Sequence, residues 1–134
     1  MRSFNLKIVT PHGVHFDGQA EGITVRTVGG DMSIWSGHVD AVTALGIGKA
    51  GVTVDGERRY AACSGGVLSV IKGDVTVLAS TFEWAEEIDL ERAREDLAKG
   101  KEELAAATDE KSVQLAKQRI TRALVREGVK TGEI

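Results

Sequence analysis

The chain has 134 residues and a mass of 14.3 kDa, with 42% hydrophobic and 28% charged residues, which is enough for one ordinary domain or a small domain with an appendage. The formal net charge of −3 argues against a protein that binds nucleic acid through an excess of positive charge. The sequence contains no apolar run of the ~20 residues that a membrane-spanning helix needs, and no signal peptide is predicted at its start. The single cysteine, Cys63, excludes an internal disulfide and is typical of a reducing compartment.

The composition changes near residue 80. Residues 1–80 hold 13 of the 16 glycines and equal numbers of basic and acidic side chains, 7 of each. Residues 81–134 hold 10 basic and 13 acidic side chains and the other 3 glycines. We therefore expect two structural units, residues 1–84 and residues 85–134.

The first unit has the pattern of short strands. Apolar residues alternate with polar ones, and glycine-containing turns separate the segments. Asp55-Gly56 supplies the positive φ angles of a two-residue hairpin turn, while Gly65-Gly66 reads as another turn. The segment 67–71 is apolar on both faces, so we expect it to lie between layers. Strands are expected at 4–8, 23–26, 32–35, 52–54, 57–60, 67–71 and 75–79. Such a series without intervening helices predicts a β-sandwich or flattened barrel.

The second unit has helical periodicity. Apolar residues recur every three or four positions from Leu90 to Leu104 and from Val113 to Leu124. Asp89 is expected to cap the first helix, Thr108 or Asp109 the second, and Gly128 to end it. The short connection predicts an antiparallel hairpin. Because many seam residues are alanine or glycine, which bury little apolar surface, the closed hairpin is expected to be only marginally stable. The predicted fold class is thus α+β, a β-sandwich followed by a two-helix hairpin.

The residues that commonly carry chemistry form no convincing catalytic or metal site. His12 and His15 are three residues apart, which places them on opposite faces of an extended chain, and His38 is distant. Cys63 precedes a strand rather than a helix, and nothing in the sequence selects a base for it. We therefore predict neither catalytic residues nor a metal site. The alternative, a small enzyme using Cys63 or the histidines, rests on residue identity alone.

The arginines of the helical unit predict an anion-binding site. Arg122 and Arg126 are four residues apart and share one helix face, where like charges repel. Folding the hairpin about Ala107 brings Arg92 level with Arg122, near the first unit. Either glutamates at positions 83, 86 and 87 neutralise this cluster, or a polyphosphate does, since the arginine fork matches phosphate oxygens. Backbone and side-chain groups near Ile88 and Asp89 could then contact a base.

Three segments in order, Gly30–His38, Ser64–Val70 and Asp74–Ala79, resemble the epsilon subunit of bacterial F-type ATP synthases. The resemblance runs nearly from end to end of the chain. Residues 88–93 (IDLERA) resemble the nucleotide-binding signature of family members that sense ATP, and residues 122–126 (RALVR) resemble its partner on the second helix. The sequence departs from the family at Ser36 and Asp40, where many members have proline.

The resemblance implies a β-sandwich that binds the gamma subunit and the membrane-embedded c-ring, and a hairpin that either folds against it or extends into the catalytic alpha/beta hexamer. The subunit would turn with the rotor, couple rotation to proton or sodium transport, and restrain ATP hydrolysis when extended. It would lie at the cytoplasmic face of the bacterial cell membrane and contact the membrane only through its partners, with Asp31 and His38 near the rotor contacts. No cofactor is required, but ATP is a possible regulatory ligand. The expected nucleotide-binding residues are Glu83, Ile88, Asp89, Arg92, Ala93, Arg122 and Arg126.

A second hypothesis assigns the chain the same nucleotide site but no place in an ATP synthase. A stand-alone ATP-sensing adaptor would bind ATP without partners from an ATP synthase. Complex formation with a gamma subunit separates the two hypotheses.

Overall fold

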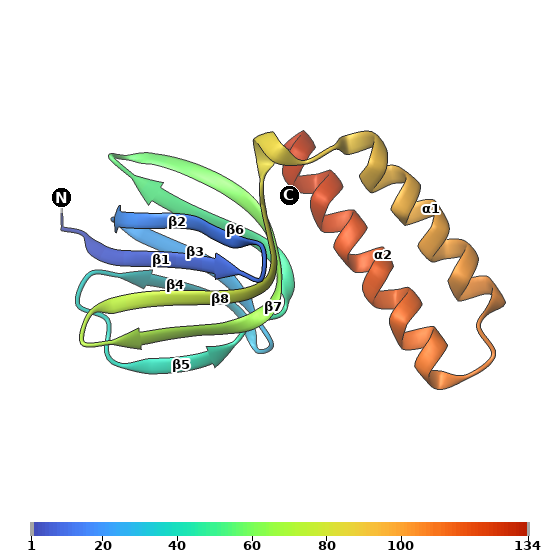
Figure 1. Ribbon diagram of the computed structural model, residues 1–134, viewed down its shortest axis with the longest axis horizontal. Helices are drawn as coiled ribbons and strands as arrows, with labels where there is room; N and C mark the ends of the chain where they lie inside the picture. The colour runs from blue at the N-terminus through green and yellow to red at the C-terminus, as the bar shows by residue number, and fades with distance from the viewer. Residues whose placement is uncertain (1, 134) are drawn as a thin grey trace.

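The computed structural model describes residues 2–133 and has two parts, a β-structure and a helical hairpin at one end of it (Figure 1). In chain order the elements are β1 (Phe4–Thr10), β2 (Gly13–Ala20), β3 (Gly22–Thr27), β4 (Gly30–Trp35), β5 (Ala41–Ala44), β6 (Ile47–Val54), β7 (Glu57–Ile71), β8 (Asp74–Trp84), the 3-10 turn η1 (Ala85–Glu87), α1 (Leu90–Ala106) and α2 (Glu110–Thr131). This confirms the predicted fold class. Neither helix in the described part contains an apolar stretch long enough to cross a membrane.

The strands pair in the order β2-β1-β8-β7-β6-β3-β4, and β5 pairs with β7. All pairs are antiparallel except β1 with β8, which are parallel. The sheet folds over one apolar core, into which alternate residues of each strand point. The largest fully buried side chains are Leu6, Ile8, Ile23, Ile34, Leu68, Val25, Val52, Val70 and Val77.

Strand β7 spans 15 residues and bends in its middle. Its first part pairs with β6 and its second part with β5, while β8 follows it along most of its length. The bend is at Gly65 and Gly66, whose φ angles are 66° and 102°. A Cβ atom on Gly66 would lie 1.9 Å from the carbonyl oxygen of Leu78. The predicted turn at these glycines is therefore wrong: they bend a continuous strand instead of ending one.

The hairpin turn at Asp55-Gly56 is confirmed, with φ angles of 51° and 78° and Val54 paired to Glu57. The expectation that the segment 67–71 lies between layers is wrong. Leu68 and Val70 are buried, but Val67 is 40% and Ile71 56% exposed. The apolar run belongs to a central strand, of which only one face meets the core.

Both helices begin at the expected caps. The Asp89 side chain accepts the backbone N–H of Arg92 at 3.1 Å, and the Asp109 side chain accepts that of Ser112 at 2.7 Å. Each carboxylate satisfies a backbone donor that has no partner within the first turn of its helix.

The second helix is longer than predicted. It continues through Gly128, which is buried, and ends at Thr131, where Gly132 with a φ of 77° is the C-cap. Leu124 is also 50% exposed rather than in the seam. The buried residues of the seam are small, as predicted: Ala93, Gly100, Ala116 and Ala123. These let the two helix backbones approach closely.

The hairpin meets the sheet through α2, which contacts β6 and β7. A small apolar cluster of Ala62, Ile88 and Val129 lies at this junction, with Ala85 and Val125 packed against it. The main core of the sheet is separate from this cluster. The docked position of the hairpin therefore rests on few buried apolar side chains.

Candidate functional site

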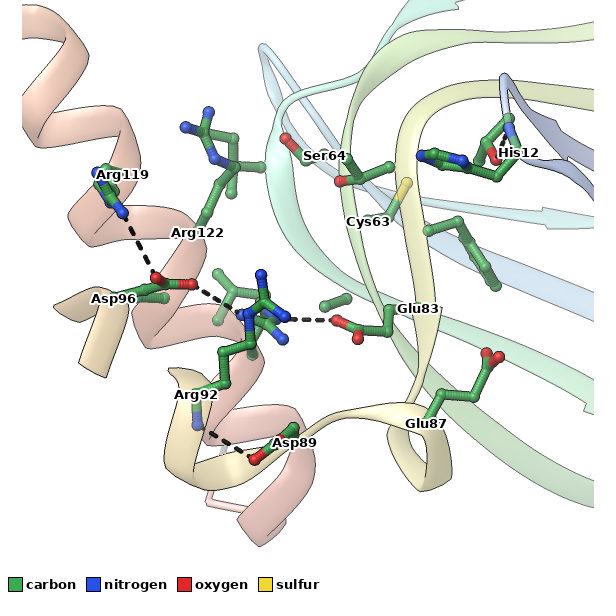
Figure 2. Close-up of a pocket in the computed structure, with 18 of the residues that line it drawn as sticks. His12, Cys63, Ser64, Glu83, Glu87, Asp89, Arg92, Asp96, Arg119 and Arg122 are labelled. Carbon is green, nitrogen blue, oxygen red and sulfur yellow. Dashed lines mark hydrogen bonds and ion pairs between the residues drawn. The ribbon is translucent and has the colours of Figure 1, made fainter. Parts of the chain in front are cut away.

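A cleft of about 830 Å³ lies between the helical hairpin and the sheet. Figure 2 shows charged side chains of the hairpin on one wall and residues of the sheet on the other. The lining residues that sequence analysis also singled out are Cys63, His12, His15, Glu83, Glu87, Asp89, Arg92, Arg122 and Arg126. The structure thus brings the three predicted arginines to one cleft beside the sheet.

Arg126 lies at the centre of this arrangement. Its Nε donates to Oε1 of Glu83 at 2.8 Å, and its Nη1 donates to Oδ2 of Asp96 at 3.3 Å. The side chain of Arg126 is 20% exposed, and those of Glu83 and Asp96 are 32% and 30% exposed. One guanidinium therefore joins α2 to both α1 and the end of β8, in a partly desolvated position where charge pairing is stronger than at the surface.

Asp96 also pairs with Arg119, whose Nη2 lies 3.5 Å from Asp96 Oδ1. Nη1 of Arg119 donates to Glu103 at 2.5 Å. Neither Asp96 nor Arg119 is among the site residues predicted from the sequence. The same hairpin register that aligned Arg92 with Arg122 also brings residue 96 level with residue 118, one position from Arg119, so this register could have revealed the pair.

Arg92 and Arg122 remain without a carboxylate partner among residues 2–133. In Figure 2 the Arg92 side chain points toward the space between Asp96 and Glu83, and the Arg122 side chain lies apart from these two carboxylates. The sequence leaves two alternatives for neutralising the cluster, glutamates or a polyphosphate. Glu83 neutralises Arg126, whereas two of the three guanidiniums stay available to an added anion.

The other two glutamates serve the junction between β8 and α1. Glu87 accepts the backbone N–H of Trp84 at 3.0 Å, which closes the 3-10 turn. Glu86 pairs with Arg59 at 2.5 Å, and hydrogen bonds from its own backbone and from Arg59 lower the pKa of Glu86. Arg59 also stacks on the Trp84 ring, with its guanidinium carbon 3.8 Å from the ring centroid. These glutamates are thus engaged on the sheet side of the junction.

Ile88 and Ala93, which belong to the predicted nucleotide-binding set, are 3% and 0% exposed. Ile88 packs against Ala62 and Val129, so its side chain is not available to stack on a base. Ala93 fills the seam between the helices, where a larger side chain would separate them. Both residues therefore support the shape of the cleft, while Asp89 lines it and caps α1.

The two predicted rotor-contact residues lie at opposite ends of β4. Asp31 is exposed near its start and pairs with Arg26 at 3.4 Å. His38 follows its end and hydrogen-bonds the carbonyl oxygen of Val39 at 2.7 Å, in the 36–40 segment at the end of the sheet far from the helices (Figure 1). About 13 Å of extended strand separates Asp31 from Trp35, so Asp31 and His38 lie apart on the surface, and their contact with the rotor stays a prediction.

Cys63 lines the cleft but is 5% exposed. Burial raises its pKa to about 11, so the thiol stays protonated at neutral pH, where nucleophilic chemistry requires a thiolate. His15 hydrogen-bonds the buried Thr10 hydroxyl at 2.7 Å and packs on Phe82. Within residues 2–133, no group of three or more His, Cys, Asp or Glu side chains is arranged to hold a metal ion.

The chemistry of the cleft is that of anion binding. Guanidinium groups on both helices face a hollow large enough for a small ligand, and arginine matches the geometry of phosphate oxygens. Carboxylates at positions 83, 89 and 96 offer acceptors for sugar hydroxyl or base amino groups.

Comparisons with known proteins agree with this architecture. Residues 3–85 match the family model of the ATP synthase delta/epsilon chain, beta-sandwich domain. The chain is 35% identical to an ATP synthase epsilon chain of Ruminococcus albus over 127 residues, covering 94% of this chain and 95% of the relative. It is 36% identical to that of Bacillus velezensis over 126 residues, covering 94% and 96%.

Two solved structures share the fold. A chain of the Euglena gracilis mitochondrial ATP synthase, from a structure of its OSCP/F1/c-ring, superposes with a TM-score of 0.81 and 21% identity, covering 98% of this chain and 82% of that one. A chain from the central stalk and c-ring of the Tetrahymena thermophila mitochondrial ATP synthase has a TM-score of 0.70 and 14% identity, covering 96% and 97%. At these identities the likeness establishes the fold alone.

Proposed function

Because the chain belongs to the family of ATP synthase epsilon chains, we propose that it is a non-catalytic rotor subunit whose helical hairpin regulates ATP hydrolysis and binds ATP when docked. The β-structure is the part that attaches to the gamma subunit and the c-ring. The hairpin is the movable part, which reaches the alpha/beta hexamer when it extends. The complex that contains it transports protons or sodium ions, and this chain lies on the cytoplasmic face of the bacterial cell membrane.

The observation that carries the regulatory part is the arginine cleft. Arg92 and Arg122 face it without a carboxylate partner among the described residues, and Arg126 adds a third guanidinium. Because the cleft has walls from both the hairpin and the sheet, a ligand in it would favour the docked pose over any pose that separates them. A polyphosphate with an attached base fits this combination of charge and size.

The docking contact supports a movable hairpin. Full burial of a valine- or isoleucine-sized side chain stabilises by about 1.5–3 kcal/mol, and Ile88 and Val129 are the two such residues in the junction cluster. That contribution is small enough for a ligand or a protein partner to compete with. Marginal stability of the docked hairpin remains a prediction, and it agrees with the small residues in the helix seam.

An apolar face of the sheet supports protein–protein contact. Val42 on β5, Val67 and Ile71 on β7 and Leu78 on β8 are between 40% and 72% exposed, and Val67 lies directly opposite Leu78 in the strand register. Asp40 accepts the backbone N–H of Lys72 at 2.8 Å, which holds the 36–40 segment beside this face. We assign the face to the gamma subunit, since exposed apolar patches of this kind are typical of interfaces.

Assembly is tested by mixing the chain with the gamma subunit from the same organism and following complex formation by gel filtration. We expect a complex with the natural chain and its loss with Leu78→Glu. Val28→Glu is the matched control, because Val28 is 79% exposed in the β3–β4 turn, outside the apolar face. Failure of the natural chain to bind gamma, combined with ATP binding, would favour the stand-alone adaptor hypothesis.

Nucleotide binding is tested by calorimetry on the full chain with ATP. Arg122→Ala and Arg126→Ala should each weaken ATP binding by about tenfold or more, the scale of a lost charge-assisted hydrogen bond. Arg94→Ala serves as the control because Arg94 is exposed and pairs with Glu127 at 3.8 Å, away from the lining of the cleft. Equal affinities in all four proteins would remove the phosphate assignment.

Regulation is tested in the assembled ATP synthase. Deletion of residues 88–134 should raise the rate of ATP hydrolysis while leaving assembly intact, because the apolar face and the main core lie before residue 88. An assembled complex that hydrolyses ATP no faster would contradict the inhibitory role of the hairpin.

A further inference from the structure

The guanidinium of Arg126 already donates to two carboxylates in the empty cleft. A guanidinium binds phosphate best through two parallel N–H donors on one edge. One such edge of Arg126 includes Nε, which donates to Glu83 at 2.8 Å. The other edge is formed by the two Nη atoms, of which Nη1 donates to Asp96 at 3.3 Å. Each edge of Arg126 that could bind a phosphate through two donors thus includes a nitrogen that is already bonded to a carboxylate.

Of the two carboxylates, Asp96 is the one that a ligand can displace more easily. Its contacts with Arg126 and Arg119 are 3.3 and 3.5 Å long, at the weak end of hydrogen-bond geometry. The contact of Glu83 with Arg126 has an ordinary length of 2.8 Å. Arg119 keeps a second partner in Glu103 when Asp96 leaves.

Asp96 also places a negative charge in the wall of the cleft. It follows Arg92 by four residues on α1, so the two side chains share one helix face, and both line the hollow together with Arg122. Its carboxylate repels an entering polyphosphate and reduces the net positive charge that the three arginines present. Both effects oppose binding of an anion at this position.

We propose that Asp96 is an internal competitor of the nucleotide's phosphates: it occupies Arg126 in the empty cleft and lowers the affinity of the cleft for ATP. This inference rests on the proposed binding of ATP. When the nucleotide binds, its phosphates take the Arg126 donor that Asp96 releases, while Glu83 keeps its own contact. Asp96 thereby sets the nucleotide concentration at which the hairpin responds.

If Asp96 instead helped the cleft to bind ATP, removing its charge would lower the affinity for ATP. If Asp96 positioned Arg126 for the phosphates, removing its charge would leave the guanidinium misplaced and weaken binding. The direction of the change in affinity therefore separates a competitor from a positioning residue.

The test compares the full-length natural chain with Asp96→Asn, which keeps the shape of the side chain and removes its charge. Calorimetry with ATP and, separately, with inorganic tripolyphosphate should give about tenfold tighter binding to Asp96→Asn than to the natural chain. Adenosine, which has no phosphate, should bind both proteins equally. Glu102→Gln is the matched control: it removes one negative charge from an exposed position of the same helix, and it should leave all affinities unchanged.

Circular dichroism checks that each variant keeps its helices, and Asp96→Ala provides a second variant with the same expected gain. Tighter binding of both phosphate ligands by the Asp96 variants alone would establish the proposal. Equal or weaker binding of ATP by folded Asp96→Asn, or an equal gain in Glu102→Gln, would overturn it and leave the proposed ATP binding intact. If neither the natural chain nor Asp96→Asn bound ATP, the proposed ATP binding itself would fail and this inference with it.

Discussion

Replacing Gly100 by alanine should destabilise the helical hairpin, although alanine has the higher helix propensity. Gly100 is buried in the seam of α1, and a Cβ atom there would lie 2.8 Å from Cγ1 of Ile120 and 3.4 Å from its backbone nitrogen. Carbon atoms in ordinary contact are about 3.5–4.0 Å apart. Overpacking of this kind costs about 1–3 kcal/mol, against a gain of about 1 kcal/mol in helix propensity. The expected net loss is about 1 kcal/mol.

The effect of Gly100→Ala on hairpin stability should change sign when Ile120 is shortened. Ile120→Ala removes Cγ1, so Gly100→Ala introduced into that variant should stabilise the hairpin by about 1 kcal/mol. Stability is measured by urea unfolding followed through the helical circular dichroism signal and by hydrogen exchange of the α1 amides. Ala98→Gly, at an exposed position of the same helix, reports the propensity difference without the seam. Equal effects of Gly100→Ala in both backgrounds would refute the steric explanation.

Three further predictions concern other parts of the chain. Burial raises the pKa of Cys63 to about 11 from 9.0, so the unfolded chain ionises first and stability should fall by up to about 2–3 kcal/mol between pH 9 and 11; urea unfolding of Cys63→Ala should have a shallower pH dependence over this range. Asp89→Ala should cost about 1 kcal/mol through loss of the α1 cap and Asp89→Asn much less, measured by hydrogen exchange at the first turn. Arg59→Gln removes the guanidinium that covers Trp84, and in a Trp35→Phe background the emission of Trp84 should shift to longer wavelength; an unchanged spectrum would show that Arg59 does not shield the ring.

Local chemistry made part of this fold predictable. Asp55-Gly56 specifies its turn through two positive φ angles, and Asp89 and Asp109 specify the helix starts through their own side chains. The register of the helical hairpin could be predicted because a short loop between two antiparallel helices fixes which residues of the two helices lie side by side. That alignment brought Arg92, Arg122 and Arg126 together at the sheet, as the structure has them.

What could not be predicted depends on contacts distant in sequence. The parallel pairing of β1 with β8 joins residues about seventy positions apart, such as Leu6 with Val75, and leaves no local pattern. The strand β2 carries exposed and half-buried residues along most of its length, so it lacks the alternation that reveals a strand. The bend at Gly65 and Gly66 reads as a turn until the partner strand β8 is known. Ile88 looks like a surface contact until Ala62 and Val129 are seen to cover it.

If ATP binds as proposed, the position of Arg126 links its binding to the pose of the hairpin. This side chain belongs to α2, its partner Glu83 to the end of β8 and its partner Asp96 to α1. Withdrawing the hairpin from the sheet breaks the contact with Glu83, but it leaves the contact with Asp96 within the hairpin. As long as the two helices stay paired, Asp96 neutralises Arg126 in either pose, whereas a nucleotide held between hairpin and sheet would gain its full set of contacts only in the docked pose. Because a ligand shifts an equilibrium only through such differential affinity, exchange of Asp96 for phosphate at Arg126 would make docking of the hairpin depend on the nucleotide.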